Sequence, residues 1–124
     1  MQLEAVDIDL DTPQLSLAHL GKFDVVLFLG VFYHLIDPIA CLREVASLAQ
    51  GVLVVETHLE PSPETRPMMV FYPGTELAGD GSNWWGPNEV AVRELLNHFG
   101  FQVDHFCLGS SPNRGIFHAS RKPT

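Results

Sequence analysis

The most pronounced apolar stretch of the chain covers residues 23–29 and is interrupted only by Asp24. Continuous apolar runs of this length are typical of strands buried on both faces of a parallel sheet. Gly30 ends the run, and residues 31–36 form a predicted loop with two aromatic side chains and a histidine. Because ligands of open α/β sheets bind at the carboxyl ends of strands, this loop is the first candidate for a binding site.

A helical pattern follows directly after this loop. Asp37 is a favourable N-cap residue, and Pro38 suits the first turn of a helix. One helical face is then marked by apolar residues at helical spacing, namely Ile39, Leu42, Val45, Ala46 and Ala49. Gly51 ends this pattern, and residues 52–55 predict a second buried strand that runs into Glu56, Thr57 and His58.

The N-terminal part predicts two further elements ahead of residues 23–29. Apolar and acidic residues alternate between positions 3 and 10, with one slip in phase, which predicts a strand. A turn signal around Pro13 follows, and residues 13–20 predict a short helix. The chain is therefore expected to begin with a strand and a helix.

Residues 59–86 interrupt the regular pattern because proline and glycine recur throughout the segment. Loops of this length inside a compact domain are usually functional or disordered. Four aromatic residues favour an ordered, functional loop, and they are Phe71, Tyr72, Trp84 and Trp85.

The regular pattern resumes at Pro87, where a helix is predicted with an apolar face and with Gly100 at its end. Residues 101–108 and 115–120 then predict two strands, the last of them antiparallel to its partner. Strands that alternate with helices in this way predict an α/β fold with a mostly parallel sheet.

Composition limits the classes of function. The chain has 124 residues, 46% of them hydrophobic and 18% charged, which suits one packed domain. Its net charge of −8 argues against a basic nucleic-acid surface. The two cysteines and six histidines show no metal-ligand spacing, so no metal site is predicted. No signal peptide or membrane-spanning run is apparent, which favours a cytoplasmic protein.

Several short motifs, in this order, carry a resemblance to a known family. They are the Phe23-Asp-Val-Val run, Gly30-Val-Phe-Tyr-His, Asp37-Pro38, Val54-Val-Glu-Thr, Trp85-Gly-Pro, Gly100-Phe101 and the closing Arg114 to Arg121-Lys-Pro. Together they resemble the C-terminal part of class I S-adenosylmethionine (SAM) methyltransferases. The chain looks most like enzymes that modify wobble uridine 34 of tRNA. The resemblance implies a truncated Rossmann-like fold, with residues 1–124 as a single partial methyltransferase-like domain.

The resemblance also implies which residues meet the donor, SAM or carboxy-SAM. Asp7 matches the acidic position that approaches the adenine, with Asp9 as the alternative, although both also suit a solvated strand face. Residues 29–31 (Leu29, Gly30 and Val31) would line the donor at the strand end. Tyr33 and Arg114 match positions that hold the extra carboxylate of carboxy-SAM, which suits an arginine fork and a phenol donor. The alternative is a core tyrosine and a surface arginine.

The acceptor side is expected to combine six residues, and they are Tyr33, His34, Asn83, Trp84, Trp85 and Arg114. Tryptophans in a loop above a sheet can stack on a base or another ring, or they can cover the core. A single histidine after a strand more often fixes a loop by hydrogen bonds, so no catalytic residue is assigned. The acceptor is either a small molecule or tRNA.

The chain departs from the family pattern in one respect. A glycine-rich loop after a first strand is missing, because the single Gly-x-Gly, at residues 79–81, follows no predicted strand. Without that first strand, residues 23–29 would present an unpaired apolar edge, which is a liability. Either residues 3–10 fill the gap or a second chain does, so a homodimer or a partner chain is expected.

Three hypotheses follow for the function. The first is a SAM-dependent methyltransferase-like protein, active when a partner or further segment supplies the missing half. The second is a non-catalytic α/β module that dimerises or binds a partner. The third is a small-ligand binder that uses the tryptophan loop.

Overall fold

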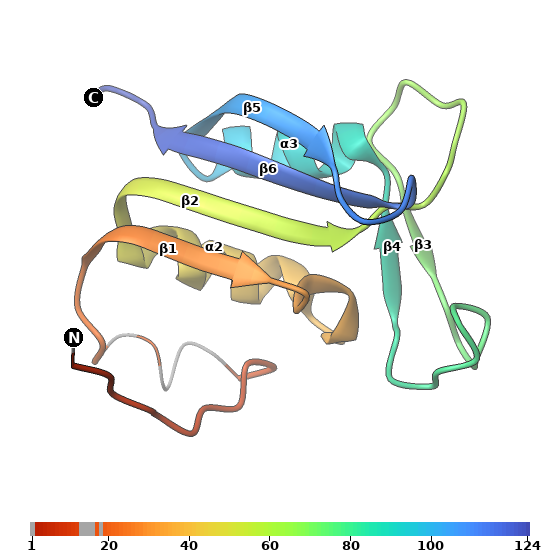
Figure 1. The fold of residues 1–124 in the computed structure, drawn as a ribbon, viewed down its shortest axis with the longest axis horizontal. Coiled ribbons are helices and arrows are strands. Elements are labelled where there is room, and N and C mark those ends of the chain that lie inside the picture. Colours follow the sequence, from red (N-terminus) through yellow and green to blue (C-terminus); the bar gives the residue numbers. More distant parts are fainter. Residues whose placement is uncertain (1, 13–16, 18) are drawn as a thin grey trace.

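The computed structural model describes residues 2–12, 17 and 19–124. Its main sheet has the strand order β1-β2-β6-β5 (Figure 1). The strands are β1 (Phe23–Leu29), β2 (Ala49–His58), β5 (Phe101–Leu108) and β6 (Arg114–Arg121). β1 and β2 pair in parallel, whereas β6 is antiparallel to both β2 and β5. Three of these strands therefore share one direction and only the last opposes them, which confirms the predicted fold class.

Two helices begin where the sequence predicts. The first ends before the predicted stop at Gly51, because residues 49–51 already belong to β2. α2 spans Pro38–Leu48, and the Asp37 carboxylate accepts a hydrogen bond from the backbone N–H of Ala40. α3 spans Glu89–His98, and the Asn88 side chain caps it by accepting from the N–H of Ala91. Each cap satisfies one of the free N–H groups at a helix start, which is why these side chains fix the helix boundaries.

Both helices pack on the same face of the main sheet. Their buried side chains form one core with the strands, with Leu42, Val45, Val92 and Leu96 from the helices and Phe28, Leu53, Val55 and Phe117 from the sheet. The opposite face of β1 stays open within the described residues, since Val25 is 55% exposed and Leu27 is 63% exposed. The prediction that residues 23–29 are buried on both faces is therefore wrong for the described chain, because both helices lie on one side.

The N-terminal prediction also needs correction. Residues 2–9 form no strand, and β1 pairs only with β2 within the described residues. Ile8 and Leu10 touch the core, but Leu3 and Val6 are largely exposed, so the alternating pattern is not matched by a buried face. Asp11 fixes this segment instead, because its Oδ1 accepts hydrogen bonds from the backbone N–H groups of Ile36 and Asp37. The helix predicted over residues 13–20 falls mostly outside the described residues.

The long segment before α3 is ordered, as predicted, and contains a small second sheet. Strands β3 (Met69–Phe71) and β4 (Trp85–Pro87) pair in an antiparallel manner. This sheet stands at the end of the main sheet toward which β1 and β2 point (Figure 1). The N–H of Trp84 donates to the carbonyl of Tyr33, which joins the segment to the 3-10 turn η1 (Phe32–His34).

Among the described residues, the helices are too short or too polar to span a lipid bilayer.

Candidate functional site

Gly30 and one residue from each of three further elements converge where β1 and β2 end. Gly30 follows β1 with a φ of 68°, Tyr33 lies in η1, Glu56 lies in β2, and Arg114 begins β6. A Cβ placed on Gly30 would lie 3.6 Å from Glu56 Oε1, 3.8 Å from Tyr33 Oη and 3.9 Å from Arg114 Nη2. The positive φ favours glycine, so Gly30 turns the chain directly beneath these three polar groups. The structure thus brings Gly30, Tyr33 and Arg114 together, as the sequence predicts.

A two-pronged ion pair organises this corner. Arg114 Nε donates to Glu56 Oε2 at 3.1 Å, and Nη2 donates to Glu56 Oε1 at 2.8 Å. Nη2 also donates to the Tyr33 hydroxyl at 3.1 Å. The hydrogen bonds from Arg114 lower the pKa of the Glu56 carboxyl, and the same bonds raise the pKa of Arg114. Both groups are therefore charged at neutral pH.

A cavity of about 220 Å³ adjoins this corner. It is lined by Tyr33, His34, His58, Leu77, Ala78, Asp80, Asn83 and Arg114. Asn83 is only 4% exposed, and its amide nitrogen donates to the carbonyl of Leu77 at 2.9 Å. Its Oδ1 is buried and has no hydrogen-bond partner among the described residues. Buried polar atoms are almost always paired, so this oxygen is free to accept a hydrogen bond from a water or a bound molecule.

His34 holds the rim of this cavity. Its Nδ1 lies 2.9 Å from the carbonyl oxygen of Ser82, and Asp80 accepts hydrogen bonds from both the N–H and the hydroxyl of Ser82. These bonds from Ser82 lower the pKa of Asp80. His34 thus fixes a loop, the role that the sequence favoured for a single histidine after a strand.

A second polar cluster borders the cavity through His58. His58 is only 6% exposed, and its Nε2 lies 3.1 Å from the hydroxyl of Tyr72. That hydroxyl donates to Glu60 Oε2, which also lies 3.6 Å from His58 Nε2. Burial lowers the pKa of His58 and raises the pKa of Tyr72. His58 is therefore a neutral imidazole at neutral pH.

The two tryptophans lie outside the residues that line this cavity. Trp84 stacks on Phe71 with ring centroids 6.3 Å apart, and Trp85 packs against the same ring at 5.1 Å. The indole N–H of Trp85 donates to the carbonyl of Ile36 at 3.0 Å. Phe71 is 49% exposed, so the three rings form an aromatic surface on the small sheet.

The remaining predicted donor residues are placed differently. Leu29 ends β1 on the open face of the sheet, and Val31 precedes η1. Asp7 is exposed in the N-terminal segment that forms no strand, and its role toward adenine stays a prediction. The predicted open edge of β1 is present within the described residues, and a chain that covers it also stays a prediction.

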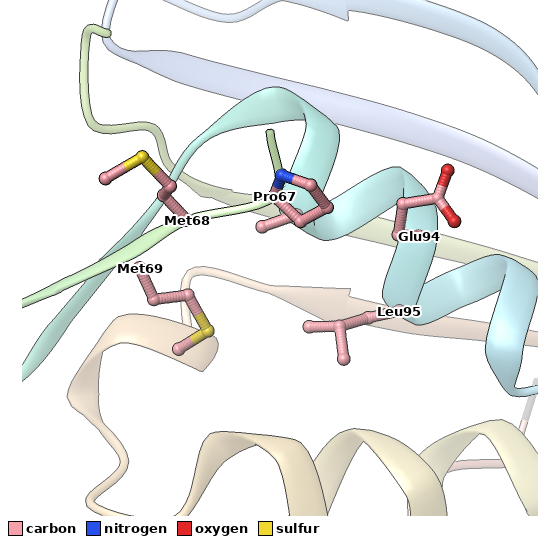
Figure 2. Close-up of a pocket in the computed structure, with 6 residues that line it drawn as sticks. Pro67, Met68, Met69, Glu94 and Leu95 are labelled. Atoms are coloured by element: carbon pink, nitrogen blue, oxygen red, sulfur yellow. The ribbon is translucent and has the colours of Figure 1, made fainter. Parts of the chain in front are cut away.

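Another cavity of about 220 Å³ lies between β3 and α3. Met69 and Leu95 extend toward this space, whereas the Glu94 carboxylate points away from it (Figure 2). We place the functional site at the other cavity, because that one joins several hydrogen-bonding side chains to the ends of parallel strands. Within the described residues, no group of three or more His, Cys, Asp or Glu side chains suits a metal ion.

Sequence reasoning missed the contributions of Tyr72 and Glu60, and it gave Glu56 and His58 no role. One signal was available, since Glu56 and His58 are two residues apart at a strand end and therefore share a face. No local pattern pointed to Tyr72, because it reaches His58 only through the folding of the long loop.

Comparison with known proteins shows which family the chain resembles. The family described as "Methyltransferase domain" matches residues 2–106. The chain is 36% identical over 92 residues to the tRNA U34 carboxymethyltransferase of Idiomarina loihiensis, a match that covers 69% of this chain and 28% of that protein. The chain thus matches little more than a quarter of this relative's length.

Solved structures share the fold. Magnesium protoporphyrin IX methyltransferase from Synechocystis PCC 6803, determined with bound S-adenosylhomocysteine (SAH), aligns with a TM-score of 0.62 and 22% identity, over 93% of this chain and 49% of that one. The N-terminal domain of EvdMO1 with SAH bound aligns with a TM-score of 0.57 and 22% identity, over 94% of this chain and 52% of that one. From the match over residues 2–106, the chain belongs to the methyltransferase-domain family.

Proposed function

We propose that this chain supplies the strand-end part of a SAM-dependent methyltransferase site. The observation that carries the proposal is the convergence of Tyr33, Glu56 and Arg114 around Gly30 at the ends of two parallel strands. Ligands of such sheets bind at this edge. Solved proteins that share the fold were determined with SAM or SAH bound.

Gly30 and its neighbours Leu29 and Val31 form the donor side of this proposal. Gly30 has no side chain, so the backbone can approach the donor closely at the strand end. The transfer itself is a displacement at the carbon next to the sulfonium, and positioning with exclusion of water supplies much of the acceleration. Asp7 remains our candidate for the adenine contact.

Arg114 and Tyr33 decide which donor the site prefers. Arg114 uses Nε and Nη2 for Glu56 and Tyr33, so within the described residues Nη1 is the nitrogen without a hydrogen bond. That nitrogen and the Tyr33 hydroxyl suit a carboxylate on the donor, which is the feature of carboxy-SAM. The name of the relative from Idiomarina loihiensis, a carboxymethyltransferase, supports this choice.

The acceptor would enter beside Asn83 and His34, which line the cavity, with the ring surface of Trp84 and Trp85 nearby. Aromatic surfaces of this kind can stack on a base. The net charge of −8 gives the chain little attraction to RNA, so a tRNA acceptor would need further basic surface from a partner. A small-molecule acceptor has no such requirement. In either case we expect a cytoplasmic location.

A second chain is also part of the proposal. β1 has a free edge, and Val25 and Leu27 are exposed on the open face of the sheet within the described residues. Unpaired apolar edges tend to be covered. We expect a homodimer or a complex with a partner chain at this edge. A non-catalytic binding module, the alternative function, would use the same edge. Light scattering after size exclusion tests this, because Leu27→Lys should then release monomers, whereas a wild-type monomer would contradict it.

Calorimetric titration with SAH, SAM and carboxy-SAM tests the donor proposal. We expect saturable binding that Arg114→Lys weakens most for carboxy-SAM, because lysine lacks the planar fork of donors. Arg66→Lys is the matched control, since Arg66 forms an exposed pair with Glu64 away from the site. Absence of binding by all three compounds would refute the donor proposal and favour the non-catalytic module.

A further inference from the structure

From the cluster around His58 we infer a proton-accepting subsite. We propose that His58, held by Tyr72 and Glu60, takes the proton from an acceptor group that carries an O–H or N–H and lies in the cavity beside Asn83. This inference rests on the proposed function, because it assigns a role within the same site. It concerns His58, to which the sequence alone assigned no role.

The hydrogen-bond network settles which imidazole nitrogen is free. The Tyr72 hydroxyl has one proton, and it donates that proton to Glu60. The Tyr72 oxygen therefore accepts from His58 Nε2, which must carry the imidazole proton. Nδ1 is left with its lone pair and makes no hydrogen bond within the described residues. His58 lines the cavity and Nε2 is already used by Tyr72, so Nδ1 is the nitrogen left for a bound molecule.

The surroundings of His58 suit a general base that is transiently protonated. Glu60 Oε2, 3.6 Å from Nε2, would stabilise the imidazolium, whereas Arg114 opposes it. The phenols of Tyr72 and Tyr33 pack against the His58 ring, and Asp80 and His34 line the same cavity. Burial lowers the pKa of His58, so the ring is neutral and ready to accept a proton at neutral pH.

The lining of the cavity supplies a second acceptor of hydrogen bonds. Asn83 Oδ1 is buried without a partner among the described residues, while its nitrogen is already used by Leu77. Both His58 Nδ1 and Asn83 Oδ1 therefore accept hydrogen bonds. A group that donates, such as an alcohol, a phenol or an amine, fits a cavity with this lining better than an ether or a thioether.

The transfer needs no reactant other than the sulfonium donor and the acceptor. A bond forms between the acceptor's oxygen or nitrogen and the transferred carbon, and the bond from that carbon to the sulfonium sulfur breaks. Sulfur keeps the electron pair, and the acceptor's proton passes to Nδ1 of His58. The imidazolium later returns this proton to water.

The test uses 4-nitrophenol and 4-nitroanisole as probes of the 124-residue chain. At a pH slightly below the probe's own pKa, we expect the protein to increase the phenolate absorbance of 4-nitrophenol. The His58 ring should show the nitrogen chemical shifts of an imidazolium at the same time. 4-Nitroanisole, which has no proton to give, should leave the His58 signals unchanged.

Variants separate His58 from its surroundings. His58→Gln should abolish the added phenolate absorbance, whereas His98→Gln, at an exposed helix position, should retain it. Glu60→Gln should reduce the absorbance because the imidazolium loses its carboxylate. This variant keeps the test decisive even when His58→Gln does not fold.

Three results would overturn the inference: no added phenolate with the wild-type chain, undiminished phenolate in both variants, or a ring that stays neutral while phenolate forms. None of these measurements requires SAM. If the donor titration fails and the phenolate test succeeds, the proposed function is refuted and His58 remains a proton acceptor. If the donor titration succeeds and the phenolate test fails, the proposed function stands and the role of His58 is refuted.

Discussion

Arg114 and Glu56 lie 58 residues apart in the chain, yet their side chains form a paired contact of 2.8 and 3.1 Å at the end of the sheet. The contact exists because β6 runs antiparallel to β2, with Glu56 opposite Ile116 and His58 opposite Arg114. It couples the stability of this edge to the charge of the candidate site. Four predictions follow from this corner and its neighbours, and one from a buried thiol.

Arg114→Lys should lower the free energy of unfolding by about 1 kcal/mol. Lysine cannot form the two-pronged hydrogen bonds to Glu56, and the Glu56–Arg114 pair is partly exposed. Arg66→Lys, in an exposed pair with Glu64, should change it very little. Urea unfolding of both variants measures the difference. Equal effects would show that the Glu56–Arg114 pair contributes no more than an exterior ion pair.

The free energy of unfolding should decrease at acidic pH because Glu56 becomes protonated. Its pKa is lowered in the folded state, so the unfolded chain binds more protons at acidic pH. The stabilisation is therefore complete above the ordinary value of 4.5 and is lost as the pH falls through the lower, folded value. Unfolding of wild type and Glu56→Gln along an acidic series checks this, and the variant should show a shallower decline.

Gly30→Ala should cost about 1 kcal/mol, because alanine disfavours the positive φ at this position. Gly21→Ala is a matched control, since Gly21 has a φ of 87° with no atom within 4 Å of an added Cβ. Both should lose similar stability, but only Gly30→Ala should change donor binding. If Gly21→Ala alters binding equally, the effect reflects general destabilisation.

Gly86→Ala should destabilise the chain by about 1 to 3 kcal/mol, because the new methyl group overlaps the Tyr72 hydroxyl. The displaced tyrosine should also change the ring signals of His58, which it contacts. Gly81→Ala, whose Cβ would meet only Thr75 at 3.9 Å, should do neither. Thermal unfolding and nuclear magnetic resonance of the histidine rings provide the two measurements.

The two cysteines should differ in reactivity. Cys41 is fully buried, and burial raises the pKa of its thiol to about 12, so little thiolate forms at neutral pH. Cys107 is only partly buried and should react first with a disulfide reagent. Denaturant should make both react. Prompt reaction of Cys41 in the native chain would contradict its place in the core.

Local patterns were enough to locate most elements. Residues 23–29 form β1 with the predicted limits, and Asp37 and Asn88 cap α2 and α3. These signals are local, because apolar spacing and a capping side chain act within a few residues of each other. The family resemblance likewise implied that Tyr33 and Arg114 lie close together, which their hydrogen bond confirms.

The strand expected over residues 3–10 failed for a non-local reason. Alternating residues form a strand only when a neighbouring edge takes up their backbone hydrogen bonds and one face is buried. Here Asp11 fixes the segment to the start of α2 instead, and Leu3 and Val6 stay exposed. The sequence pattern could not show which of these arrangements the N-terminal segment adopts.

By itself the sequence determined the α/β class, the direction of the last strand, the start of each helix and the limits of the strand before Gly30. Only the tertiary structure decided that both described helices cover one face of the sheet. It also decided that Glu56 forms the ion pair with Arg114, and that Tyr72 hydrogen-bonds to the imidazole of His58 and orients it. Periodicity and capping report on neighbours along the chain. Residues that strand order or a long loop brings together leave no local pattern in the sequence, because their proximity depends on how the whole chain folds.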